Sequence, residues 1–195
     1  ARRGSRIKPT LFISDLHLDA ADPAVVRQFR AFLETDARRA EALYILGDLF
    51  EAWLGDDDPD PLAREVVAAL RALSDAGVPC FVMHGNRDFI AAAGFAEGIG
   101  ATLVADPTVI DLYGTRTILL HGDTLCTDDL AYQQFRAQVR DPLRQRRFLA
   151  LPYLARRALV ANLPAGPRGR AGKGRDRSRV IVGLHLHERV HGFTL

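Results

Sequence analysis

The feature that most constrains the fold is a repeated order in which a short apolar run is followed at once by polar residues. Strands are predicted over Ile7–Ser14, Leu43–Leu46 and Pro79–Met83, and the motifs SDLHLD, GDLFE and HGNRD lie at their ends. Short apolar runs bounded by turn residues are typical of buried strands. We therefore expect the loops after the strands to form the functional site.

Helices are predicted between these strands. Asp22–Pro23 supplies an N-cap and a first-turn proline for a helix to about Thr35, and Asp60–Pro61 repeats that signal for a helix that ends at Gly77. Strands that alternate with helices indicate a layered α/β fold with helices packed on a largely parallel or mixed sheet. The length of 195 residues fits a single domain, 1–195.

The second half of the chain predicts a hairpin and then a helical region. The strands Val109–Tyr113 and Arg116–Leu120 are separated by Gly114–Thr115. Asp128 is predicted to cap a helix through Ala137, and Pro142–Leu163 reads as a longer helical region interrupted at Pro152. Residues 164–179 are rich in glycine and arginine, which predicts a flexible basic loop before a last short strand, Val180–Val182.

Composition narrows the class of protein. No apolar run has the roughly 20 residues of a membrane-spanning helix, and no signal-peptide pattern follows the basic start, so a cytoplasmic protein is expected. Cys80 and Cys126 indicate neither a disulfide framework nor a thiolate metal site. Carboxylates dominate from Asp48 to Asp60 and arginines from Arg136 to Arg179, which suggests an anionic substrate or an anionic lipid surface.

The motifs together carry a set of metal-ligating side chains. The candidate ligands, in chain order, are Asp15, His17, Asp48, Asn86, His121, His185 and His187. In extended backbone Asp15 and His17 would point the same way, and the carboxylate of Asp48 can bridge two cations. Imidazoles with carboxylates suit manganese, iron or zinc better than calcium. Two such ions would support hydrolysis of a phosphate ester or anhydride.

The order D-x-H, GD, GNRD, HGD and H-x-H resembles the calcineurin-type metallophosphoesterase superfamily. More narrowly, the runs LFISDLHLD, YILGDLFEAWLGDD, VMHGNRDF and LLHGDTLCTDDLAYQQFR are similar to those of the UDP-2,3-diacylglucosamine pyrophosphatase family of lipid A biosynthesis. The likeness extends from about Thr10 to Asn162 and implies the layered calcineurin-like fold with a helical lid at 128–163. It also implies a lipid-linked UDP-sugar substrate and a place on the cytoplasmic face of the inner membrane.

The resemblance further implies a site of two Mn2+ ions. Asp15, His17, Asp48 and His187 would hold one ion, and Asp48, Asn86, His121 and His185 the other. Asp48, Arg87 and His121 are implied as catalytic, and Asn86, Arg87, Asp129 and His185 as substrate-binding. Arg87 would hold the pyrophosphate, because a guanidinium does not readily act as an acid. The implied reaction is attack of a metal-activated water on the α-phosphorus, giving UMP and a diacylglucosamine 1-phosphate.

The segment Phe148–Leu163 resembles the lid that accepts acyl chains in that family. The candidate lining residues are Leu149, Leu151, Tyr153, Leu154, Leu159 and Val160, and Arg156 and Arg157 are expected to face phosphate or the membrane interface. In an unknown protein such a stretch more often belongs to the core, and both interpretations stay open. The oligomeric state cannot be read from the sequence.

The resemblance stops after Asn162. An ungapped count places Pro167, Ala171 and Gly174 where the family has serine, asparagine and lysine, and the final motif reads Gly183-Leu184-His185-Leu186-His187 instead of G-H-T-H. Two hypotheses follow. The chain is an active pyrophosphatase, or it is an impaired phosphoesterase-fold protein that binds lipid or nucleic acid through its basic C-terminal part. A related enzyme for other phosphodiesters is disfavoured by Arg87 and the lid-like stretch.

Simpler roles are expected for the remaining polar residues of the motifs. His84 is expected to be a satisfied strand-end histidine, Asp123 to orient the loop around His121, and Asp56–Asp58 to be a solvated loop. Arg87 has a structural alternative, an ion pair with Asp88. The basic loop lacks the interleaved aromatic residues of a nucleic-acid arm, so no nucleic-acid partner is expected.

Overall fold

The computed structural model describes residues 8–85, 88, 93–125 and 127–161, and the central feature of these residues is a parallel sheet. Its four strands lie in the order β1 (Thr10–Ile13), β2 (Ala42–Ile45), β3 (Cys80–Met83) and β4 (Thr102–Val104). Ile13 pairs with Ile45, which pairs with Val82 in turn. Because all strands run the same way, the loops that follow them meet at one edge of the sheet.

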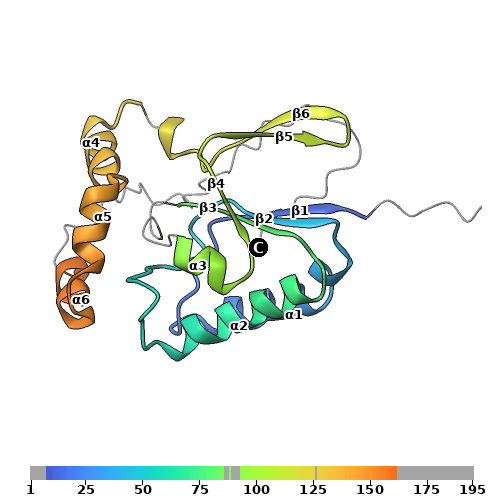
Figure 1. Cartoon of the computed structure of the whole chain (residues 1–195), viewed down its shortest axis with the longest axis horizontal. Helices are drawn as coiled ribbons and strands as arrows, with labels where there is room; N and C mark the ends of the chain where they lie inside the picture. Colours follow the sequence, from blue (N-terminus) through green and yellow to red (C-terminus); the bar gives the residue numbers. More distant parts are fainter. Residues whose placement is uncertain (1–7, 86–87, 89–92, 126, 162–195) are drawn as a thin grey trace, which may run out of the picture.

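Two helices cover one face of this sheet (Figure 1). They are α1 (Pro23–Glu34) and α2 (Pro61–Asp75), and the carboxylates of Asp22 and Asp60 accept hydrogen bonds from backbone N–H groups of their first turns. Both caps and both first-turn prolines are as the sequence predicts. Apolar side chains of α1 and α2 pack with Leu11, Leu43 and other residues of the strands in the larger core.

A hairpin covers the other face of the sheet, formed by β5 (Thr108–Leu112) and β6 (Thr115–Leu119). Alternate strand residues point to this side, where Phe12, Tyr44 and Leu46 pack with Leu112 and Leu119 in a second core. Because both faces of the sheet are covered, side chains on both sides of β1, β2 and β3 are largely buried. The sequences of these strands are therefore continuously apolar instead of alternating between apolar and polar residues.

A helical arm stands at one end of the molecule (Figure 1). It consists of α4 (Leu130–Val139), α5 (Pro142–Leu149) and α6 (Tyr153–Ala161). The break between α5 and α6 lies where Pro152 predicts it. None of the side chains of α4 and α5 is fully buried, so apolar burial contributes little to how this part of the arm docks. Within the described residues, no helix combines the length and apolar character that crossing a bilayer requires.

The structure differs from the sequence-based expectations in three places. Helix α3 (Ala93–Gly98) and strand β4 are additional elements. The hairpin turns at Tyr113–Gly114, both with positive φ, rather than at Gly114–Thr115. The cap of α4 is Asp129 and not Asp128, because the Asp129 carboxylate accepts a hydrogen bond from the Tyr132 N–H at 2.9 Å. The predicted loop 164–179 and strand Val180–Val182 lie outside the described residues.

Candidate metal centre

The loops after β1 and β2 are joined by backbone hydrogen bonds at the carboxyl edge of the sheet. The N–H groups of Asp15 and His17 donate to the carbonyls of Gly47 and Asp48 at 3.2 and 3.0 Å. Asp15, His17 and Asp48 all have positive φ, between 47° and 54°. The expectation that Asp15 and His17 align through extended backbone is therefore wrong; two left-handed residues bring them together. Such conformations cost energy and cluster at functional sites.

Asp15, His17 and Asp48 form a compact cluster. Each offers a ligand atom, and these atoms lie within 4.8 Å of one another. Asp15 Oδ2 is buried and has no hydrogen-bond partner among the described residues. Burial raises the pKa of Asp15 above its ordinary value, although Ser14 and the nearby histidines oppose this effect. An oxygen that is buried and unpaired fits a position where a cation would bind.

His121 approaches the same cluster from the end of β6. Its Nδ1 lies 2.9 Å from the Leu46 carbonyl oxygen, and since a carbonyl only accepts, Nδ1 carries the proton. The lone pair of a neutral ring is then at Nε2, which lies 3.9 Å from Asp48 Oδ2. His17 Nε2 lies 3.8 Å from the same oxygen. The Asp48 carboxylate is therefore close to both imidazoles.

These residues fit a divalent metal centre. A carboxylate between two imidazole nitrogens provides the oxygen and nitrogen ligands of manganese, iron or zinc. His121 Nδ1 bonds the Leu46 carbonyl, so its ring is oriented from behind as that of a metal-binding histidine is. His17 Nδ1 lies 3.2 Å from Glu51 Oε2 but makes no hydrogen bond to the described residues. Asp15, His17 and Asp48 would hold one ion, and His121 approaches the same carboxylate of Asp48.

Asp88 is a residue of the site that the sequence analysis did not single out for this role. Its Oδ1 accepts from the N–H groups of Asp48 and Gly85 at 3.1 and 2.8 Å, and its Oδ2 accepts from Leu49 N–H at 2.9 Å. Burial raises the pKa of Asp88, and the neighbouring Asp48 carboxylate adds to this shift. Asp88 thus fixes the backbone that carries Asp48. Its place at the end of the HGNRD motif was the available signal.

Two glycines permit the loops to approach this closely. A Cβ atom at Gly47 would lie 2.6 Å from Gly85 Cα and 2.7 Å from His121 Nδ1. A Cβ atom at Gly85 would lie 2.7 Å from Asp88 Oδ1 and closer still to Asp48. A side chain at either position would force the candidate ligands apart.

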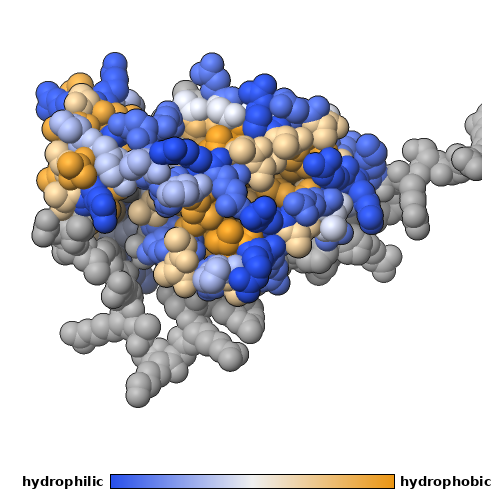
Figure 2. All heavy atoms as spheres, turned by 90° about the horizontal axis from the view of Figure 1, so that it is seen from below, coloured by the Kyte–Doolittle hydropathy of each residue, from blue (hydrophilic) through white to orange (hydrophobic). Residues whose placement is uncertain are grey.

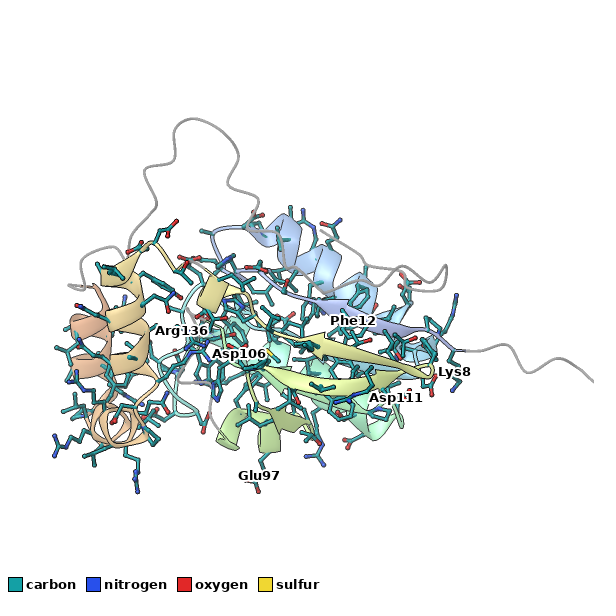
Figure 3. The ribbon with its side chains drawn as sticks, turned by 90° about the horizontal axis from the view of Figure 1, so that it is seen from above. Lys8, Phe12, Glu97, Asp106, Asp111 and Arg136 are labelled. Atoms are coloured by element: carbon teal, nitrogen blue, oxygen red, sulfur yellow. The ribbon has the colours of Figure 1, made fainter. Side chains whose placement is uncertain are left out.

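The helical arm is linked to this edge of the sheet by ion pairs. Asp106 follows β4, Asp123 follows His121 by two residues, and both carboxylates pair with Arg136 and Arg140 of the arm. Figure 3 shows Arg136 reaching Asp106 between the arm and the sheet. Burial raises the pKa of Asp123, but the two arginines outweigh it, and the net shift is downward. Asp123 therefore connects the His121 loop to the arm.

Arg156 differs from its predicted position. It is expected from the sequence to face phosphate or the membrane interface, but its side chain is buried, 2% exposed, and it pairs with Asp57. Asp57 therefore anchors α6, so the segment Asp56–Asp58 is not merely a solvated loop. The neighbouring Arg157 is exposed and lines a pocket of about 480 Å³ with Tyr153, Glu51 and Leu54.

The other predicted site residues are placed as follows. Asp129 is half-buried and caps α4, and its substrate role stays a prediction. His84 is half-buried, and burial together with the charge of Arg140 lowers the pKa of its imidazole. Asn86, Arg87, His185, His187 and Cys126 lie outside the described residues, as do Pro167, Ala171 and Gly174.

Comparison with known proteins defines the class to which this fold and site belong. Residues 8–159 match the family model described as calcineurin-like phosphoesterase, so the chain belongs to that family. It is 57% identical over 159 residues to the UDP-2,3-diacylglucosamine hydrolase of Salmonella arizonae, and 55% identical over 159 residues to that of Escherichia coli O7:K1. Each match covers 82% of this chain and 66% of the relative, so the chain spans just under two thirds of their length.

Proposed function

We propose that this chain hydrolyses the pyrophosphate bond of UDP-2,3-diacylglucosamine with two bound Mn2+ ions, giving UMP and 2,3-diacylglucosamine 1-phosphate. The observation that carries the proposal is the position of Asp48 Oδ2, 3.8 Å from His17 Nε2 and 3.9 Å from His121 Nε2. A carboxylate between two imidazoles is suited to bridge a pair of divalent ions. The likeness to hydrolases named for this substrate supports its identity.

The residues of the chain would prepare the site in three ways. The Leu46 carbonyl keeps the Nδ1 proton of His121 in place, so that Nε2 presents a lone pair without any change of tautomer. Asp88 holds the backbone at Asp48 through the N–H groups of Asp48 and Leu49, which limits reorganisation during reaction. Bound divalent ions would supply Lewis acidity and a water of lowered pKa at the phosphoryl group.

The arm would receive the lipid part of the substrate. Leu130, Leu143, Leu154 and Leu159 are more than half exposed, and exposed arginines lie between them in the sequence. Figure 2 shows apolar and hydrophilic side chains intermixed over this end of the molecule. Leucines with interspersed arginines suit contact with acyl chains and an anionic lipid surface. We infer a peripheral position on the cytoplasmic face of the inner membrane.

The proposal is tested by measuring UMP release from UDP-2,3-diacylglucosamine with added Mn2+. We expect release that a chelator abolishes and that falls at least about 100-fold in Asp48→Asn and His121→Ala, since loss of even an outer-shell partner of a metal costs 10- to 100-fold. Asp111→Asn is the matched control, because Asp111 is exposed on the hairpin and only accepts from Gly114 N–H.

Folding of every variant is checked by circular dichroism. Absence of UMP release from folded wild-type chain overturns the proposal and favours a lipid- or nucleic-acid-binding protein on the same fold. Equal activity of Asp48→Asn and Asp111→Asn overturns the assignment of the site.

A further inference from the structure

A single face of α4 contacts the loops of the candidate metal centre through polar side chains. Tyr132, Arg136 and Arg140, here called the α4 stripe, are spaced four residues apart and therefore share one face of the helix. All three reach Asp123 Oδ2, at 2.9 Å from the Tyr132 hydroxyl, 2.9 Å from Arg136 Nε and 3.3 Å from Arg140 Nη2. Gln133 adds a bond to the Asp123 carbonyl at 2.9 Å.

The α4 stripe also contacts the loops that follow β3 and β4. Arg136 Nη2 and Arg140 Nη1 lie 3.1 and 3.2 Å from Asp106 Oδ2. The other carboxylate oxygen of Asp106, Oδ1, accepts a hydrogen bond from the His121 N–H at 3.2 Å. Arg140 Nη2 also donates to the carbonyls of His84 and Gly85 at 3.3 and 3.4 Å. The two arginines therefore join the backbone on both sides of His121 to the backbone that leads from β3.

This network contains two arginines and two aspartates, so its formal charges cancel, and all four side chains are largely buried. The carboxylates of Asp106 and Asp123 are 2% and 4% exposed, and each guanidinium is 18% exposed. Removing one arginine would leave two buried carboxylates sharing a single guanidinium, which is more costly than losing an exposed pair. Since α4 has no fully buried side chain, this network rather than apolar packing fixes its position.

We propose that Arg136 and Arg140 are positioning residues, which set His121 and the Gly85 backbone for metal binding and couple that binding to docking of α4. This inference rests on the proposed metal site. Coupling is reciprocal, so an ion bound at His121 must stabilise docked α4 by the same factor by which docked α4 strengthens ion binding.

The test measures Mn2+ affinity by electron paramagnetic resonance and hydrogen exchange of residues 130–161 with and without Mn2+. Arg140→Gln and Arg136→Gln are expected to weaken Mn2+ binding about 10- to 100-fold, the range seen for outer-shell partners of metal ligands. Arg140→Lys is expected not to restore it, because an ammonium cannot reproduce the forked contacts of a guanidinium. Mn2+ should slow exchange in α4 of the wild type and not in Arg140→Gln.

Two control variants separate positioning from general loosening. Arg144→Gln removes an exposed arginine of the arm that bonds Gln138, and Asp57→Asn removes the partner of Arg156 in α6, not a contact of α4. Both should bind Mn2+ as the wild type does. Equal Mn2+ affinity in the wild type, Arg140→Gln and Arg140→Lys overturns the coupling alone. Failure of the wild type to bind Mn2+ overturns the metal site and the coupling with it.

Discussion

At the scale of single residues, the candidate site depends on glycines that let three loops meet. Gly85 packs directly against the backbone and side chain of Asp48 and against the carboxylate of Asp88. Both aspartates are buried, so neither can move toward solvent to make room for a methyl group. Even replacement of Gly85 by alanine would therefore displace the candidate ligand Asp48 and disturb the packing around it.

Gly85→Ala is expected to lower the free energy of unfolding by about 1–3 kcal/mol, as overpacking of a close-packed site does, and to abolish Mn2+ binding. Thermal unfolding and a Mn2+ titration measure the two effects. Gly98→Ala is the control, since its Cβ would meet only Val67 Cγ1 at 3.8 Å, an ordinary contact. Normal Mn2+ affinity in Gly85→Ala would show that the loops are not as tightly placed as described.

At the scale of elements, the arm is attached at two separate points. Helix α4 is held by the ion pairs with Asp106 and Asp123, and α6 is held by the pair between buried Arg156 and Asp57. The hydrogen bond from Arg156 lowers the pKa of the Asp57 carboxyl. Because Asp57 itself is largely exposed, solvent screens part of this interaction. The cost of losing Asp57 falls mainly on Arg156, which stays buried without its partner.

Asp57→Asn is expected to lower the melting temperature at neutral pH and to speed hydrogen exchange in α6. The pKa of Asp57 is lowered on folding, so its contribution is complete above its ordinary value of 3.8 and is lost as pH falls through the lowered value. The difference in melting temperature between wild type and variant should therefore be constant above pH 5 and shrink below pH 3.8. A difference that grows on acidification would contradict this. Arg157→Gln, on the same helix but exposed, controls for loss of charge.

At the scale of the whole molecule, the candidate metal centre joins segments that are remote in sequence. The candidate ligands among the described residues come from the loops after β1, β2 and β6, and no single element contains them. An ion that binds only the folded chain adds its binding free energy to global stability. The core beneath the site is a separate source of stability, in which residues such as Leu70 are fully buried.

Mn2+ at 100 times its dissociation constant is expected to stabilise the chain by about 2.7 kcal/mol, and a chelator should reverse the effect. For a chain of this size the melting temperature should rise by about 5–10 °C. Differential scanning calorimetry measures this rise. Leu70→Ala should lower the melting temperature with and without Mn2+ but keep the increment, whereas Asp48→Asn should lose the increment. An increment that persists in Asp48→Asn would place the ion elsewhere.

Local signals in the sequence predicted the first half of the fold well. The three apolar strands and the two helices with Asp-Pro starts occur where expected, because caps and buried runs are encoded within a few residues. Strand β4 and helix α3 escaped prediction, since β4 has only three residues and its first two side chains are exposed. The sequence also could not show that Asp129 rather than Asp128 caps α4, because either carboxylate could accept a hydrogen bond from the first turn of the helix.

The sequence indicated which side chains belong to the site better than how they are held. Asp15, His17, Asp48 and His121 could be selected from motif order, and the structure places them around one carboxylate. Asp15, His17 and Asp48 have left-handed backbone with no glycine to signal it, so an extended alignment of Asp15 and His17 is the natural expectation from the sequence. The links from Arg136, Arg140 and Arg156 join residues far apart in the chain, which no local pattern specifies.

Arg136 and Arg140 come later in the sequence than Asp106 and Asp123, the carboxylates with which they pair, and this order matters during synthesis of the chain. Asp106 and Asp123 leave the ribosome before Arg136 and Arg140, and at about 5–20 residues per second the delay between Asp123 and Arg140 is about 1–3 s. A nascent chain that closes its sheet in this interval must bury two carboxylates without their cations. We therefore expect the His121 loop to close during translation only after α4 has emerged.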